Sequence, residues 1–213
     1  PLLQGEMLSA TGELDKAKEV RSQAVEDFLK LLEANPNDAD ALQSAAELLG
    51  RLGEYDRAME FSNQVVEQNP SAFSGYLLRS RLLHKQKEYE AAISDLNRAV
   101  DLNPGSFLAY LDRAEVHLDA GNSRLAAKDY NKARDLQGAS LPAVIIRRTL
   151  LRSQNDVEKG ISQLKQFLEL DELSAEMSGR EPDTEYRLQL SATYTERTMP
   201  QETIEVLTPM IEL

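Results

Sequence analysis

One period dominates this sequence, because the same residue types return every 34 positions. The chain contains EYDRAMEFSNQVVEQNP, which ends at Pro70, and then EYEAAISDLNRAVDLNP, which ends at Pro104 (104 − 70 = 34). Pro36 lies one further interval upstream. A fixed interval of this length is typical of repeat architectures, in which each repeat buries its apolar surface against its neighbours.

Each repeat is predicted to be a pair of helices. Between Leu42 and Leu52 the apolar residues follow helical spacing, and Gly53 then breaks the pattern. A second helical stretch begins at Tyr55 and ends before Pro70, since proline disfavours the helical conformation in the residue that precedes it. The sequence shows no sustained alternation of apolar and polar residues that is typical of strands. The expected fold class is therefore all α.

Two columns of the repeat pattern hold small residues. When the repeats start at Ala39, Phe73, Phe107 and Leu141, the first of these columns contains Ala46, Ser80 and Ala114. The second contains Ala58, Ala92, Ala126 and Gly160. Small side chains are needed where two helix axes approach closely, so these columns are expected at helix crossings.

A third column holds arginine and predicts an ion pair between the two helices of a repeat. Arg79 and Arg113 each lie sixteen positions before an aspartate, and Arg147 lies sixteen positions before a glutamine. The expected pairs are Arg79 with Asp95 and Arg113 with Asp129, whereas Arg147 and Gln163 form at best a hydrogen bond.

This pattern resembles the tetratricopeptide repeat family, whose repeats are helix–turn–helix units of 34 residues. The residues that carry the resemblance in the first full repeat are Leu42, Ala46, Leu49, Gly53, Tyr55, Ala58 and Pro70. The next repeat has Tyr76, Ser80, Leu83, Tyr89, Ala92, Ala99 and Pro104, and the third has Tyr110, Ala114, Gly121, Ala126, Tyr130 and Ala133. The fourth departs from the pattern, with Arg148 in a small-residue column and Glu172 in place of proline. The resemblance implies a right-handed superhelical solenoid of stacked antiparallel helix-turn-helix repeats.

The whole chain, 1–213, is expected to be a single array of such repeats. The parts are a partial first repeat at 1–38, regular repeats at 39–72, 73–106 and 107–140, a degenerate repeat at 141–174, an insertion at 175–183 and a truncated last repeat at 184–213. Two registers that differ by seven residues place Ala17 or Ala24 in the small-residue column, which predicts that the helix from Leu14 to Ala34 is two turns longer than its counterparts. Because the array is cut at both ends, the chain is expected to be a fragment of a larger protein.

Composition and motifs argue against several classes of function. The net charge of −12 disfavours general binding of nucleic acid or anionic lipid, and the apolar runs are too short to insert into a membrane. The chain has no cysteine, and it has two histidines, of which His117 is expected to pack in a helical hairpin and His84 to lie at a solvated edge. Zinc, calcium and phosphate-loop signatures are absent from the sequence. Catalysis, a metal and a cofactor are therefore not expected, and the sequence leaves the cellular compartment open.

In this family the first helices of successive repeats line a groove that commonly binds a peptide or a partner protein. Carried over by position, the groove comprises Gln43, Glu47, Leu77, Leu78, Arg81, Leu111, Asp112, Glu115, Ile145, Ile146 and Thr149. Its columns hold neither Lys nor Asn, which excludes the capture of a C-terminal carboxylate that some members perform. The expected ligand has apolar anchors and an acidic residue near Arg81 or Arg152.

Two interpretations of the apolar groove residues remain open. They hold a partner segment, or they pack against neighbouring helices or another copy of the chain. The resemblance accordingly favours a non-catalytic protein-protein interaction scaffold, and the alternative is a self-association module of a larger multidomain protein. The surface loop predicted around SGREPDTEY, residues 178–186, is either a tolerated insertion, which is the commoner case, or a further place at which a partner binds.

Overall fold

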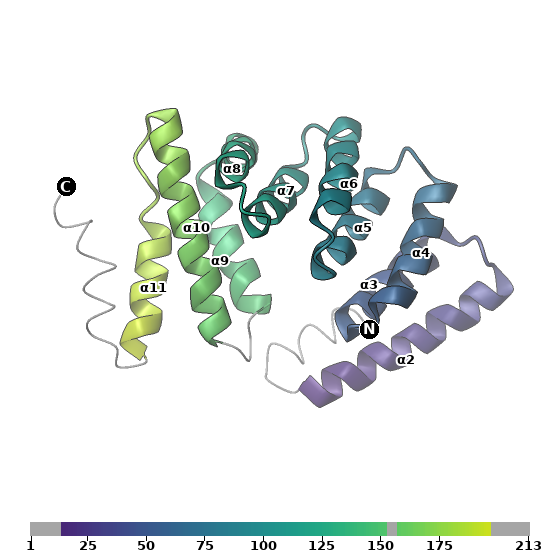
Figure 1. Ribbon diagram of the computed structural model, residues 1–213. Coiled ribbons are helices and arrows are strands. Elements are labelled where there is room, and N and C mark those ends of the chain that lie inside the picture. Colours follow the sequence, from purple (N-terminus) through teal and green to yellow (C-terminus); the bar gives the residue numbers. More distant parts are fainter. Residues whose placement is uncertain (1–13, 153–156, 197–213) are drawn as a thin grey trace. The chain divides into compact units, whose positions relative to one another are not determined.

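The computed structural model describes residues 14–152 and 157–196 and divides into two compact units, Pro1–Gly121 and Asn122–Leu213 (Figure 1). The described residues form ten α-helices and one short 3-10 helix, and they contain no strand. The predicted all-α class is confirmed. Within the same ranges, none of the helices combines the length and the apolar character that crossing a membrane requires.

Unit 1 consists of helices that pack in chain order. They are α2 (Leu14–Ala34), α3 (Ala39–Leu52), α4 (Tyr55–Gln68), α5 (Phe73–Lys85), α6 (Tyr89–Leu102) and α7 (Phe107–Asp119). Helices α3 and α4 form one hairpin and α5 and α6 the next, while α3 also contacts α5, and α5 contacts α7. The first helices of successive hairpins are therefore neighbours.

The boundaries of these helices follow from local chemistry. Asp38 begins α3, because its carboxylate accepts a hydrogen bond from the backbone N–H of Ala41 at 2.9 Å. Gly53 ends α3 with a φ of 83°, a left-handed conformation that costs glycine little. Ser106 caps α7 in the same way as Asp38, by accepting from the N–H of Ala109 at 3.3 Å. Helices α3, α5 and α7 thus begin at residues 39, 73 and 107, where the predicted repeats start.

The small-residue columns lie in the core of unit 1. Ala46, Ala58, Ala92 and Ala114 are completely buried, as is Ser80, whose hydroxyl donates to the carbonyl oxygen of Leu77. A larger side chain at any of these positions would push two helices apart. Helix α2 has 21 residues against 14 in α4, a difference equal to the seven residues between the two registers of the sequence.

Unit 2 contains α8 (Ser123–Gln137), a 3-10 turn (Gly138–Ser140), α9 (Leu141–Arg152), α10 (Val157–Ser178) and α11 (Glu185–Glu196). Helix α10 packs against α8, α9 and α11. Its 22 residues continue through positions 175–178 of the predicted insertion, so the connecting loop comprises residues 179–184 and is shorter than predicted. Of the predicted first repeat (1–38) and last repeat (184–213), residues 1–13 and 197–213 lie outside the described residues.

Candidate protein-binding surface

The predicted ion pair between Arg79 of α5 and Asp95 of α6 is present. Arg79 donates two hydrogen bonds to the Asp95 carboxylate, from Nε at 2.7 Å and from Nη2 at 2.8 Å. These hydrogen bonds with Asp95 raise the pKa of Arg79 above its usual value. Arg79 also donates from Nη1 to the amide oxygen of Asn63 in α4 at 3.0 Å. One guanidinium therefore links both helices of its own hairpin to the hairpin before it.

The link to the preceding hairpin recurs one repeat later. Arg113 donates to the amide oxygen of Asn97 in α6 at 2.8 Å. Each arginine also lies over the ring of the tyrosine three positions earlier. The guanidinium carbon is 5.8 Å from the ring centre of Tyr76 for Arg79, and 5.5 Å from that of Tyr110 for Arg113. Asn63 and Asn97 are separated by the repeat period, a signal that the sequence contained but that the prediction missed. The pair of Arg113 with Asp129 stays a prediction, and the side chain of Arg147 lies outside the described residues.

A second set of polar contacts joins the first helices of unit 1 to one another. Arg81 of α5 donates from Nε to Asp112 of α7 at 2.6 Å. Ser74 of α5 donates to the side-chain oxygen of Gln43 in α3 at 3.5 Å, which is a weaker contact. Both contacts span 31 residues, so they occur on the same side of neighbouring first helices. We refer to this side, with the partly exposed Gln43, Glu47, Ser74, Arg81 and Glu115, as the α3–α5–α7 face.

The predicted groove residues divide sharply by exposure. Gln43, Glu47, Arg81 and Glu115 are partly exposed, whereas the buried ones are Leu77, Leu78, Leu111, Asp112, Ile145, Ile146 and Thr149. Leu77 belongs to a cluster with residues such as Leu83, Leu96 and Val116, and Leu111 has no exposed surface. The apolar members of the predicted groove are thus covered within the chain, and the accessible members are polar.

Arg81 has an acidic neighbour within the chain. Its guanidinium pairs with Asp112, whose side chain is only 4% exposed, and the acidic residue of a partner expected near Arg81 stays a prediction. The Arg81 side chain remains 40% exposed. Asp112 therefore holds Arg81 in one orientation and compensates its charge from below the surface. The side chain of Arg152, the other arginine expected to meet an acid, lies outside the described residues.

The two histidines occupy different environments. His84 of α5 is partly buried and lies 2.7 Å from the carboxylate of Asp119 in α7, so it adds another contact between first helices. His117 is buried, as its column in the repeat predicts. Across the described residues, no group of three histidine, aspartate or glutamate side chains is arranged to hold a metal ion.

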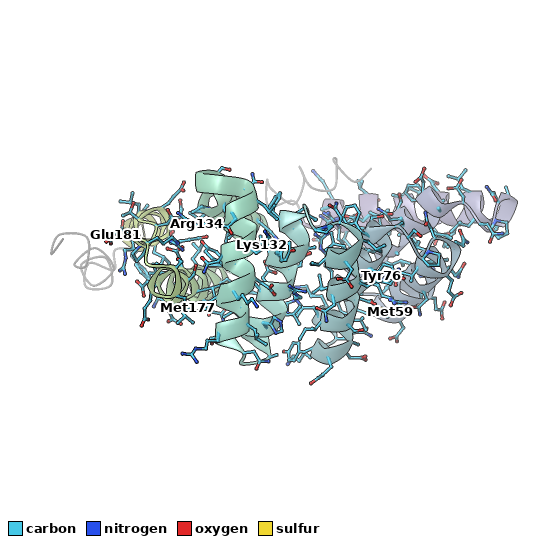
Figure 2. All side chains as sticks on the ribbon, turned by 90° about the horizontal axis from the view of Figure 1, so that it is seen from above. Met59, Tyr76, Lys132, Arg134, Met177 and Glu181 are labelled. Atoms are coloured by element: carbon cyan, nitrogen blue, oxygen red, sulfur yellow. The ribbon has the colours of Figure 1, made fainter. Side chains whose placement is uncertain are left out.

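Unit 2 contains a buried ionic network that the repeat pattern did not predict. Asp171 of α10 is fully buried and pairs with Arg180 of the loop and with Arg134 of α8, the latter at 3.7 Å. Asp183 of the same loop pairs with Arg134, and its backbone N–H donates to Asp171. Arg134 extends from α8 toward the side on which α10 and α11 lie (Figure 2). The network fastens the loop to α8 and α10.

Two buried tyrosines lie beside this network. The hydroxyl groups of Tyr130 in α8 and Tyr186 in α11 are 3.0 Å apart and share a hydrogen bond, and the Tyr186 ring stacks on Phe167 of α10. Burial raises the pKa of both phenols, and the negative charge of Asp171 adds to the effect on Tyr130. Both phenols consequently stay protonated to higher pH than an exposed tyrosine, and their shared hydrogen bond connects α8 to α11.

Known proteins support the fold seen in these two units. The model of the family described as Anaphase-promoting complex, cyclosome, subunit 3 (ANAPC3) matches residues 3–99. Among curated proteins there is no significant match. Solved structures are similar over most of the chain, as the following three show.

TTC0263, a thermophilic TPR protein of Thermus thermophilus, is 22% identical over 92% of this chain and 97% of its own, with a TM-score of 0.57. MamA is 21% identical over 81% of this chain and 96% of its own, with a TM-score of 0.53. YrrB, a TPR protein with an unusual peptide-binding site, is 19% identical over 88% of this chain and 92% of its own, with a TM-score of 0.52. The chain therefore has the fold of tetratricopeptide repeat proteins.

Proposed function

We propose that the chain is a non-catalytic scaffold that binds a segment of a partner protein on the α3–α5–α7 face. The observation that carries the proposal is that the first helices of unit 1 adjoin and are connected by side-chain contacts, above all Arg81 with Asp112 at 2.6 Å. The face is therefore continuous across repeats, and its polar groups are held in place before a ligand arrives. Side chains that are already ordered lose less conformational entropy on binding.

The chemistry of the face favours a polar or basic segment over an apolar one. Leu77, Leu78 and Leu111 are buried beneath it, while Glu47 and Glu115 are partly exposed. Glu47 pairs with Arg51 of its own helix at 2.9 Å, and the charge of Arg81 is compensated by Asp112. A similar fold in YrrB carries a peptide-binding site, which supports peptide binding as a use of this architecture. Hydrogen bonds and charge complementarity then supply the specificity.

A charge-reversal experiment tests this proposal. Glu47→Lys combined with Glu115→Lys changes the face, and Glu60→Lys combined with Glu90→Lys makes the same change of charge on exposed sites of α4 and α6. Proteins captured by the wild-type chain are identified, and the affinity of each for purified wild-type and variant chains is measured by calorimetry. We expect the face variant to weaken binding about tenfold, since two favourable charge contacts become repulsive.

Two outcomes contradict the proposal. If the α4 and α6 variant loses the partners while the face variant retains them, the binding surface lies elsewhere. If light scattering shows that the chain associates with itself, and the face variant abolishes this association without affecting any other protein, the chain is a self-association module. Circular dichroism of both variants verifies that helical content is unchanged.

A further inference from the structure

The outward side of α8 carries a stripe of basic and apolar side chains. Arg124, Lys128 and Lys132 are spaced four residues apart, so they lie on one side of the helix. Leu125 and Leu136 both lie along one side of this basic row and are separated by eleven residues, close to three helical turns. All five side chains are exposed, Leu125 by 50% and Leu136 by 39%. We call these five residues the α8 stripe.

The fold of the described residues gives the stripe no internal role. None of its three basic side chains forms an ion pair or a hydrogen bond with a described residue. Like charges four residues apart repel each other and weaken a helix. Arg134 shows the contrast on the same helix, because it extends to the opposite side from Lys132 and pairs with Asp171 and Asp183 (Figure 2).

The repeat pattern shows that the basic character is specific to α8. The columns of Arg124, Lys128 and Lys132 contain Glu90, Ser94 and Arg98 in α6, and Asp56, Glu60 and Gln64 in α4. All of these positions are exposed. The net formal charge of the three columns is thus −2 in α4, zero in α6 and +3 in α8. A solvated helix face tolerates any of these three sets of residues. The packing of the second helix of a repeat therefore does not require the basic set found in α8.

We propose that the α8 stripe is a second docking surface, which binds an acidic segment of a partner protein that also presents apolar side chains. Charge complementarity identifies this occupant, since three positive charges stand together on one side of α8, where Asp135 supplies a single negative charge, on a chain of net charge −12. Leu125 and Leu136 provide apolar contacts along one side of the charges. A nucleic acid or an anionic membrane shares the negative charge, but the rest of this acidic chain repels such extended surfaces.

Fluorescence anisotropy with a defined probe tests the docking surface. The probe is a labelled helical peptide with glutamates four residues apart and leucines beside them, and a matched peptide carries glutamine in place of glutamate. Lys128→Glu with Lys132→Glu reverses charge in the stripe, Leu125→Ser with Leu136→Ser removes its apolar part, and Arg98→Glu is the control in the Lys132 column of α6.

We expect the acidic peptide to bind the wild-type chain and the Arg98→Glu variant equally well. Binding is expected to weaken at least about tenfold in the lysine variant, to weaken in the leucine variant and to fall with salt. Equal affinity for the glutamine peptide, or equal affinity of the lysine variant for the acidic one, overturns the proposal.

Other occupants give different results. Tighter binding of anionic lipid vesicles or single-stranded DNA than of the peptide overturns the choice of a protein segment. Concentration-dependent sedimentation of the wild-type chain that is lost in the lysine variant assigns the stripe to a second copy instead. We expect the variant with Glu47→Lys and Glu115→Lys to bind the acidic peptide no more weakly than wild type. This result distinguishes the α8 stripe from the α3–α5–α7 face.

Discussion

Replacing Arg79 with methionine removes the donor group that joins three helices of unit 1. The change preserves most of the side-chain length but leaves the Asp95 carboxylate, whose side chain is 9% exposed, without its ion-pair partner. It also removes the donor for Asn63. Breaking a fully buried ion pair costs about 3–5 kcal/mol, and breaking an exposed one costs about 0–1 kcal/mol. Because Asp95 is nearly buried and Arg79 is 22% exposed, we expect a loss of about 3 kcal/mol in the free energy of unfolding.

A substitution of Asp95, the other member of the pair, is expected to lower the free energy of unfolding by less. Asp95→Asn leaves Arg79 with solvent access and with its hydrogen bond to Asn63, and the new amide still offers an oxygen acceptor. A loss of about 1–2 kcal/mol follows, because an unpaired charge that reaches water is less unfavourable than a buried one. The double variant Arg79→Met with Asp95→Leu is expected to be more stable than Arg79→Met alone, since it leaves no buried charge.

Urea denaturation followed by circular dichroism measures these free energies by linear extrapolation. Hydrogen exchange of backbone amides then shows whether the loss is confined to α5, α6 and the adjoining α4, with α10 as an internal reference. Arg98→Met is the matched control, because Arg98 is an exposed arginine of α6. A loss below about 1 kcal/mol for Arg79→Met, or a loss equal to that of the control, would refute the reasoning that burial makes this pair structurally important.

Two further predictions concern unit 2. Burial raises the pKa of Tyr130 and Tyr186 in the folded chain, so above pH 10 only the unfolded chain releases these protons, and stability falls by about 1.4 kcal/mol per tyrosine by pH 11. Urea unfolding across this range measures the slope, which Tyr186→Phe should roughly halve. Asp171→Ala leaves Arg134 and Arg180 facing each other without a carboxylate between them, and we expect a loss of about 3 kcal/mol, measured by the same method. A free energy of unfolding unchanged from wild type would show that Asp183 alone compensates both arginines.

The sequence predicted the elements of unit 1 closely because its helix ends depend on local signals. Gly53 and Pro70 act within one or two turns of the chain, so their effects can be read without knowledge of the fold. The pair of Arg79 with Asp95 was also predictable, since both residues belong to one hairpin whose geometry the repeat fixes.

The remaining features depend on contacts between elements that the period does not relate. Asp171 meets Arg134 across 37 residues, and Arg134 meets Asp183 across 49, so neither interval signals a contact. Burial of Leu111 was unpredictable for another reason. Its column identifies the helix and the side on which it lies, but how far other side chains cover it depends on packing that the sequence does not state.

Columns that repeat and columns that vary serve different physical ends in this chain. Small residues such as Ala58 and Ala92 recur because a helix crossing admits little else, and Arg79 and Arg113 recur because each joins its hairpin to an asparagine of the one before. The exposed positions of the second helices are free of that constraint, and in the three columns of Arg124, Lys128 and Lys132 the net charge changes from −2 in α4 to +3 in α8. Residues that packing leaves free are where selection for a partner can act without a loss of stability. The partners of this scaffold are therefore to be sought through the positions at which its repeats differ.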